Sequence, residues 1–409
     1  MLLADEFANF ESALSRGPLR SEQEHHPGFG HCSITPGLEF PAFREIPRDT
    51  PFATPLYQKE SSMRSRYVIT SLACLFLATP SFADEPAQKE IRIGIIGVDT
   101  SHAVEFTRLF NDDKNPDRLK GGRVVAAYPH GSKDIPSSTS RIVPNTEKIA
   151  ARDVKIVSSI EELLPLVDAV LLETNDGRPH LEQARLVIKA GKTLFVDKPV
   201  AASLKETGML LQEAHAANVP VFSSSSLRYS EDAQAARAGK FGKVYGCDAF
   251  SPESREATHP SLFWYGIHGV ETLFTVMGPG CESVTRVETE TSDVVVGRWK
   301  DGRIGTFRGL RSQPKDGPKI GYGGTIFASK ANQAIGPFKG YRPLLVEIDK
   351  FFHTGKSPVA LRETLEIYAF MEAADESTRQ GGKPVSIADT LKAAGLDPNL
   401  FEESAAAAK

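Results

Sequence analysis

This chain of 409 residues has few cysteines and no excess of positive charge, and these scarcities exclude several classes of protein. Only two of its four cysteines, Cys247 and Cys281, lie beyond residue 83. They make no disulfide framework, and we expect two separate buried thiols. Positive charge is not in excess, since the formal net charge is −4 and no basic stripe is present, so nothing indicates nucleic-acid binding. No ligand spacing of a known metal motif occurs, and no metal site is predicted.

The composition that remains is that of an ordinary globular protein. Hydrophobic residues make up 40% of the chain and charged residues 24%. The length suffices for about two to three domains.

The first sixty residues differ from the rest of the chain. They are rich in proline, histidine and arginine and show no lasting periodicity, so we expect residues 1–62 to be disordered. A new pattern starts at Met63, and we expect the true translation start there, in which case residues 1–62 are not made.

Residues 63–83 have the pattern of a secretory signal peptide. Arg64 and Arg66 form a positive segment, residues 67–78 are apolar, and Ser81-Phe82-Ala83 is a small-x-small cleavage site. The apolar run is too short to span a bilayer. We therefore expect an exported, periplasmic or extracellular protein without a stable membrane anchor; a buried or anchoring helix is the alternative.

The stretch at residues 91–102 organises the chain after the signal peptide. Its β-branched residues form a near-continuous run typical of a central parallel strand: Ile91, Ile93, Ile95, Ile96 and Val98. Apolar residues then recur at helical spacing at Ala103, Phe106, Leu109 and Phe110. A strand, a glycine turn and a helix begin a dinucleotide-binding domain.

Strands and helices alternate up to about residue 224. The pattern predicts strands at 124–128, 154–157, 168–172, 193–196 and 219–222. It predicts a polar loop up to about Pro144 and helices at 146–152, from 159, at 179–190 and at 203–217. Such alternation favours a Rossmann-like parallel sheet over residues 90–224.

Residues 225–389 show consecutive strands and predict a second, α+β domain for substrate binding and oligomerisation. Helices are expected at 231–238, 262–277, 342–352 and 364–377, and strands at 243–250, 283–290, 293–299, 304–310 and 319–328. Lys300-Asp-Gly302 is a good hairpin signal. We expect a mostly antiparallel sheet, one face of which carries a partner subunit, and a tail at 390–409. The fold class is thus α/β, with this second sheet added.

Four segments together resemble the Gfo/Idh/MocA oxidoreductase family. They are Gly94-Ile-Ile-Gly97, the strand and loop at 168–180, the segment at 190–199 that ends in Asp197-Lys198-Pro199, and Gly266-Ile-His268. The last two are similar to the family's Glu-Lys-Pro and Asp-x-Gly-x-His motifs. Arg228 and the segment at 239–244 also match, and the likeness covers about residues 90–389.

The resemblance implies a specific chemistry. A Rossmann domain would bind NAD or NADP, and a hydride would pass between the nicotinamide and a carbon of a sugar or polyol. Lys198 would hydrogen-bond the reacting oxygen and His268 would be the acid/base, roles that suit an amine and an imidazole. The implied cofactor-binding residues are Gly97, Asp99, Thr100, Ser101, His102, Thr174, Asn175, His180, Asp197 and Lys198. The implied substrate-binding residues are Arg228, Tyr229, Trp264 and Tyr265.

The chain departs from the family pattern in its glycine turn. Asp99 and His102 stand at the second and third positions of G-x-G-x-x-G, after Gly97. The carboxylate puts negative charge where a pyrophosphate would lie, and its side chain can cap the same helix N–H groups. Aspartate and histidine here also fit a plain helix cap and a packing residue.

Two further departures concern the ribose and the catalytic group. Residues 128–132 hold no carboxylate for a ribose 2′-hydroxyl, although Ser132 and Lys133 would suit a 2′-phosphate. Trp264 stands where the family motif has its aspartate.

Three functions therefore stay open. The first is an NAD(P)-dependent oxidoreductase acting on a sugar, polyol or related carbohydrate. The second is an exported carbohydrate lyase or hydrolase on the same scaffold that no longer binds dinucleotide. The third is a non-enzymatic binding protein.

Several residues also have purely structural explanations. Lys198 fits a surface lysine, His268 a packed core histidine, and Tyr229 and Trp264 core aromatics as well as sugar-stacking rings. Glu173, Asp176 and His180, with Asp99 and His102, are expected to converge at the mouth of the sheet, which would suit a metal or a polar ligand.

Overall fold

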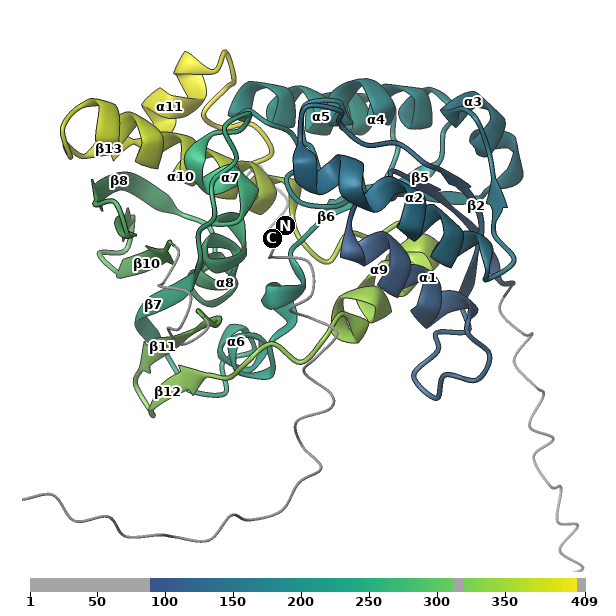
Figure 1. Cartoon of the computed structure of the whole chain (residues 1–409). Helices are drawn as coiled ribbons and strands as arrows, with labels where there is room; N and C mark the ends of the chain where they lie inside the picture. The colour runs from purple at the N-terminus through teal and green to yellow at the C-terminus, as the bar shows by residue number, and fades with distance from the viewer. Residues whose placement is uncertain (1–88, 312–319, 403–409) are drawn as a thin grey trace, which may run out of the picture. The chain divides into compact units, whose positions relative to one another are not determined.

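The computed structural model describes residues 89–311 and 320–402 (Figure 1). The expectations for residues 1–62 and for the signal peptide at 63–83 fall outside this part of the chain.

The first sheet is parallel throughout and has the strand order β3-β2-β1-β4-β5-β6. Its strands are β1 Ile91–Ile96, β2 Gly122–Tyr128, β3 Lys155–Ile156, β4 Ala169–Leu172, β5 Thr193–Val196 and β6 Val221–Ser223. The predicted Rossmann-like sheet is confirmed. The order reverses between β1 and β4, and the carboxyl ends of these strands are where such sheets bind ligands.

The helices of this domain lie on both faces of the sheet (Figure 1). They are α1 Ser101–Asn111, α2 Pro136–Ala150, α3 Ile160–Leu163, α4 His180–Lys189 and α5 Leu204–Ala216, with a short 3₁₀ turn, η1 Leu164–Leu166. The expected cap at the start of α3 is present, because the Ser159 side chain accepts a hydrogen bond from Glu162 N–H.

The loop predicted up to Pro144 is wrong, since α2 occupies most of it. Pro136 stands in the first turn of this helix, where its missing N–H costs nothing. Polar contacts hold the helix in place: Ser138 donates to Asp99, and the Asn145 amide donates to the carbonyls of Val98 and Thr100. Because these anchors are polar, the segment has no clear apolar stripe in the sequence.

The second sheet has the order β12-β11-β7-β10-β9-β8-β13. Its strands are β7 Val244–Pro252, β8 Cys281–Glu288, β9 Ser292–Trp299, β10 Ile304–Leu310, β11 Gly323–Ala328, β12 Asn332–Ile335 and β13 Val385–Ser386. Only β7 and β10 pair in parallel, so the prediction of a mostly antiparallel sheet is confirmed. The hairpin at 300–302 is also present, with Gly302 at φ 83°.

The helix expected at 262–277 is broken into α7 Ser261–Trp264 and α8 Ile267–Met277. The break lies at Tyr265-Gly266, so that α8 begins just before His268. The other helical elements of this half are η2 Ser226–Tyr229, α6 Glu231–Arg237, α9 Arg342–Thr354, α10 Leu361–Arg379 and α11 Ile387–Ala393.

Two buried clusters form the core. One joins α4 and α5 to the helices and inner face of the second sheet, and the other lies beneath α1 and α9. The expected domain limits therefore differ at two points. Helix α9, assigned by sequence to the second domain, packs its Leu344, Ile348 and Phe351 on the first sheet. The expected tail includes part of α11 and buries Leu391 and Leu396.

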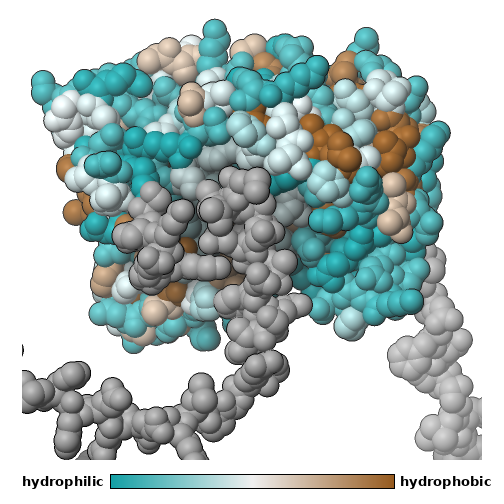
Figure 2. All heavy atoms as spheres, viewed as in Figure 1, coloured by the Kyte–Doolittle hydropathy of each residue, from teal (hydrophilic) through white to brown (hydrophobic). Residues whose placement is uncertain are grey.

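Within the described residues, Cys247 and Cys281 are unpaired and buried, as expected. None of the helices in that part combines the length and apolarity needed to cross a bilayer. Figure 2 shows one face on which hydrophilic residues predominate and hydrophobic ones form only scattered groups.

Candidate active site

The turn between β1 and α1 approaches the end of β4 closely. Gly97 has φ 87°, and a Cβ there would lie 2.4 Å from the Thr174 backbone nitrogen. Thr100 caps α1 by accepting from Ala103 N–H at 3.1 Å. The N–H groups of Ser101 and His102 have no acceptor in the described part of the chain.

Asp99 does not cap the helix, in contrast to what its position in the turn allowed. Its carboxylate is fully buried and accepts from Ser138 Oγ at 2.6 Å and from Asn175 N–H at 3.0 Å. Burial raises the pKa of Asp99, although these hydrogen bonds oppose the rise. Aspartate at the second glycine position therefore ties α2 and the loop after β4 to the turn.

Hydrogen bonds link the loop after β2 to the loop after β4. Asp176, 1% exposed, accepts from Ser132 Oγ and Arg178, and its Oδ1 lies 3.2 Å from His259 Nε2. Arg178 also pairs with Asp134 at 2.8 Å. Burial opposes ionisation of Asp176, but the bonds from His259 and Arg178 outweigh it and lower its pKa. The carboxyl ends of β1 and β4, where sheets of this strand order bind ligands, are called the crevice below, and these residues form its paired side.

The turn partly fits a dinucleotide. The unpaired N–H groups of Ser101 and His102 at the start of α1 suit a pyrophosphate, and the crevice lies at the point where the strand order reverses. The loop after β2 fits less well, because the Ser132 hydroxyl is bonded to Asp176, which leaves the exposed Lys133 for a ribose substituent. Ser101, His102 and the backbone of the turn are thus the residues that would hold the cofactor.

Three ionisable side chains meet where β4 and β5 end. His102 Nδ1 lies 2.6 Å from Asp197 Oδ2, and the ligand atoms of His102, Glu173 and Asp197 are all within 4.8 Å of one another. Burial, then the charge of Asp197, raises the pKa of Glu173 well above its usual value. Burial opposes ionisation of Asp197 as well, but His102 and Lys198 lower its pKa. We call these residues, with Lys198 and His268, the free side of the crevice.

Lys198 and His268 are brought together across the two halves of the molecule. Lys198 follows β5 and is 8% exposed, with its Nζ 5.7 Å from the centre of the Tyr265 ring. The Tyr265 ring lies edge-on to His268 at 5.2 Å. An amine and an imidazole therefore flank one aromatic ring.

The imidazole of His268 is held in one orientation. Its Nδ1 lies 2.7 Å from Ser225 Oγ, and Glu271 accepts from Ser225 N–H at 3.0 Å. Burial, followed by the positive charge of Lys198, lowers the pKa of His268 well below 6.5. The ring is neutral at pH 7, with Nε2 left for a proton transfer.

Aromatic rings border both histidines. Tyr322 lies 5.9 Å edge-on from His268, and Tyr341 lies 4.7 Å edge-on from His102. Burial raises the pKa of both phenols, so they stay neutral hydrogen-bonding groups. Flat rings beside hydroxyl groups suit the apolar face and the hydroxyls of a sugar.

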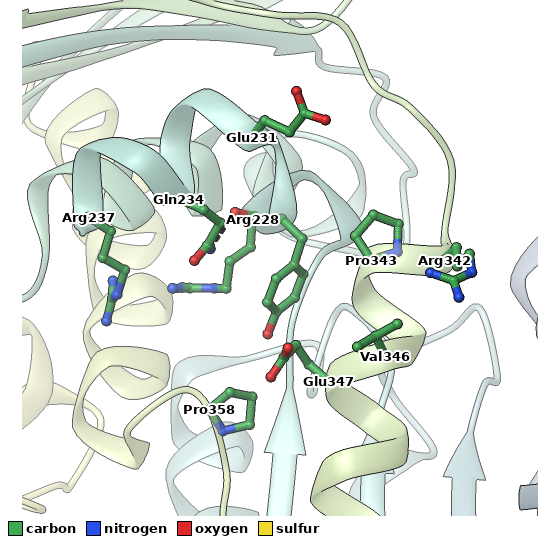
Figure 3. A pocket seen from close by; sticks show the side chains of 10 residues that line it. Arg228, Glu231, Gln234, Arg237, Arg342, Pro343, Val346, Glu347 and Pro358 are labelled. Carbon is green, nitrogen blue, oxygen red and sulfur yellow. Dashed lines mark hydrogen bonds between the residues drawn. The ribbon is translucent and has the colours of Figure 1, made fainter. Parts of the chain in front are cut away.

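Other residues predicted for the site lie elsewhere or are otherwise engaged. Both ring nitrogens of His180 face backbone carbonyls, those of Thr174 and Val200, so this histidine fastens loops together. Arg228 is buried between Glu271 and Glu363 and, with Tyr229, lines a separate cavity between α6 and α9 (Figure 3). Trp264 packs on His259 at 4.9 Å, next to the paired side.

Sequence reasoning missed Ser225, Glu271, Tyr322 and Tyr341. Only Ser225 had a signal, because it follows β6 at the carboxyl edge of the sheet, where ligands bind. Tyr322 directly precedes β11 and Tyr341 directly precedes α9, and no local motif marks either residue.

Residues 91–225 match the model of the Gfo/Idh/MocA family, an oxidoreductase family with an NAD-binding Rossmann fold. The Rossmann domain belongs to the Gfo/Idh/MocA family. The match covers the turn with Asp99 and His102 as well as Asp197-Lys198-Pro199, so these substitutions occur within the Gfo/Idh/MocA fold.

Solved structures extend the likeness to the second domain. Scyllo-inositol dehydrogenase from Lactobacillus casei, with bound NAD(H) and scyllo-inositol, has a TM-score of 0.55 at 14% identity, over 73% of this chain and all of the other. An Agrobacterium radiobacter oxidoreductase in complex with NAD+, L-tartaric acid and magnesium has a TM-score of 0.58 at 14% identity, over 74% of this chain and all of the other. At such identities the likeness shows a shared fold and nothing more. No curated protein matches the sequence.

Proposed function

We propose that this protein is an NAD(P)-dependent oxidoreductase that interconverts a hydroxyl and a carbonyl group on a sugar, polyol or related carbohydrate. The observation that carries the proposal is the meeting of Lys198, Tyr265 and His268 beside a Gfo/Idh/MocA Rossmann crevice. Structures with this fold include proteins with bound NAD(H) and scyllo-inositol, or NAD+ and L-tartaric acid.

The chain's own residues divide the work as follows. Lys198 donates a hydrogen bond to the reacting oxygen and stabilises it as negative charge develops. Neutral His268 accepts the hydroxyl proton at Nε2 in oxidation and returns it in reduction, while the Ser225 hydroxyl supports Nδ1. A bound nicotinamide would supply the hydride acceptor or donor.

Substrate selectivity follows from the rings around this pair. Tyr265 and Tyr322 offer an aromatic face and phenolic hydroxyls, which suits a ring with one apolar face and equatorial hydroxyls. Of the residues expected to bind substrate, Tyr265 has this position. Arg228 acts at most through Glu271, and Tyr229 lines the separate cavity.

Export and self-association are parts of the same proposal. The pattern at residues 63–83 supports export by a cleaved signal peptide. The face of the second sheet turned away from α8 and α10 exposes Tyr245, Phe250 and Ile304, which supports a homo-oligomer through this face. Light scattering on the purified chain tests the assembly, and a Phe250→Glu, Ile304→Glu variant should then be monomeric.

Cofactor binding tests the central claim. The purified chain is denatured and its supernatant is assayed for nicotinamide, and the emptied protein is titrated calorimetrically with NADH and with NADPH. Binding of either, followed by turnover of an inositol or aldose in a spectrophotometric screen, is the expected result. No released cofactor and no heat with either nucleotide would reject the proposal, and carbohydrate lyase or hydrolase activity would then be assayed.

A further inference from the structure

Three buried side chains from separate elements converge on one point of the free side. His102 comes from the first turn of α1, Glu173 directly follows β4, and Asp197 directly follows β5. They are 7%, 0% and 1% exposed, and their ligand atoms lie within 4.8 Å of one another. Atoms bound about 2.1 Å from a common ion lie at most about 4.2 Å apart, so small side-chain adjustments would let the three share an ion.

Three of the four carboxylate oxygens in this cluster lack a partner within the described residues. Neither oxygen of Glu173 nor Oδ1 of Asp197 has a hydrogen-bond partner among the described residues. Burying an ionised carboxylate without partners is strongly unfavourable, and nearly all buried polar atoms in folded proteins are hydrogen-bonded. Asp176, an equally buried carboxylate three positions along the chain, bonds to Arg178 and Ser132, so the chain does provide partners elsewhere.

The donor set is that of a metal centre. One imidazole and two carboxylates suit a divalent ion such as Zn²⁺ or Mn²⁺, and three protein ligands leave positions open for an external oxygen. The His102 ring is fixed by stacking on Phe106 at 5.4 Å and by the Tyr341 edge. A dication would also neutralise the two negative charges.

We propose that His102, Glu173 and Asp197 form a binding site for a divalent cation, Zn²⁺ or Mn²⁺, whose open positions face the crevice. The proposal goes beyond the dehydrogenase function and does not depend on it. Asp197 adjoins Lys198, so the cation would hold an oxygen of a bound ligand on the side of the crevice where the catalytic pair lies.

The proposed metal site explains why a histidine, His102, stands at the third glycine position. Glycine there provides close helix–strand packing, whereas His102 places a nitrogen against Asp197. No metal motif is visible in the sequence because the three ligands are 71 and 24 residues apart along the chain, at positions 102, 173 and 197.

Metal retention tests the site directly. The full chain is stripped with a chelator, incubated with ZnCl₂ or MnCl₂, desalted and analysed by plasma mass spectrometry. We expect about one ion per chain and a rise in Tm with added metal. Glu173→Gln and Asp197→Asn should each lower affinity at least about 100-fold, since even outer-shell partners are worth about 10- to 100-fold.

Asp176→Asn is the matched control, because it removes a buried charge from the same loop but no proposed ligand. It should retain the ion like the wild type. Failure of the wild-type chain to retain either ion or to gain thermal stability would overturn the proposal and indicate a proton shared between Glu173 and Asp197. Equal retention by Glu173→Gln would overturn it too. Because no nucleotide or substrate is present, the result is independent of the dehydrogenase test.

Discussion

Glu173 and Asp176 belong to one loop and are equally buried, yet the protein treats them in opposite ways. Asp176 accepts hydrogen bonds from Ser132 and Arg178, whereas both oxygens of Glu173 are without partners in the described part of the chain. The same contrast extends to the two sides of the crevice. On the paired side polar groups satisfy one another, and on the free side they are left available.

This difference indicates that the paired side of the crevice has a structural role and that the free side is where a ligand binds. A saturated network is rigid and has no capacity left for a ligand. Unpaired buried groups cost stability, so their presence points to a bound partner that the protein itself does not supply. Within the described residues, both oxygens of Glu173 and one oxygen of Asp197 are such groups, and they lie on the same side as Lys198 and His268.

The largest expected effect is on turnover, which the free side alone should control. Lys198→Ala removes the donor to the reacting oxygen and should lower kcat by about 10²- to 10³-fold. His268→Gln removes the proton acceptor and should lower kcat by about 10²- to 10⁴-fold. Steady-state kinetics with the substrate found in the screen provide the measurement.

Lys205→Ala, an exposed lysine on α5, is the control for these kinetics and should be fully active. Circular dichroism should show all three variants folded. Wild-type kcat in Lys198→Ala would remove this lysine from the mechanism.

The second effect is on the free energy of unfolding, and it should differ in direction between substitution of Asp176 and substitution of Glu173. Asp176→Asn weakens charge-assisted hydrogen bonds and should lower the free energy of unfolding by about 1.5–3 kcal/mol. Glu173→Gln, in chelator, replaces a buried carboxyl whose raised pKa already disfavours its charged form, and should leave stability unchanged or raise it. Urea denaturation of both variants decides this, and an equal loss in both would abolish the distinction between the two sides.

The third effect concerns the turn that joins the sides. Gly97→Ala should destabilise by about 1–3 kcal/mol, because the new Cβ would meet the Thr174 backbone at 2.4 Å in a left-handed conformation. Gly191→Ala is the control, since its φ is 64° but nothing lies within 4 Å of the added carbon. It should cost about 1 kcal/mol. Thermal unfolding would contradict this account if the two variants lost equal stability.

The smallest effect is in the pH dependence of the free side. Burial and Lys198 lower the pKa of His268, so native imidazole stays neutral at pH values where the unfolded chain already binds a proton. Stability should therefore fall as the pH drops below 6.5, the ordinary histidine value. The acid limb of kcat for oxidation should likewise lie below pH 6.5, and a limb at or above that value would disagree.

Sequence patterns predicted the fold well where burial dictates residue type. The apolar residues of β1 and β4 are buried, and Lys300-Asp-Gly302 turns a hairpin, so both features could be predicted from local sequence. Helix α2 could not, because Ser138 and Asn145 hold it through partners that lie 39 to 47 residues away. The break before α8 could not be predicted either, because the apolar residues on its two sides fit a single continuous helix at 262–277.

The sequence predicted which side chains of the candidate site lie near the edge of the sheet, but not how each is oriented or which partners it bonds. Lys198 and His268 follow from the family motifs, and the carboxyl ends of β4 and β5 bring Glu173 and Asp197 to one edge. Which groups are satisfied depends on the tertiary structure. His180 and Arg228 are engaged by carbonyls and carboxylates that only the folded chain brings to them.

Gly97 changes how a glycine fingerprint should be interpreted. The backbone just after β4 leaves no room for a side chain, so this glycine reports how closely the turn approaches the end of β4, whether or not a nucleotide is bound. The second and third positions carry no such restriction and here hold Asp99 and His102. The first glycine is therefore a marker of architecture, and its presence alone does not show that a nucleotide binds.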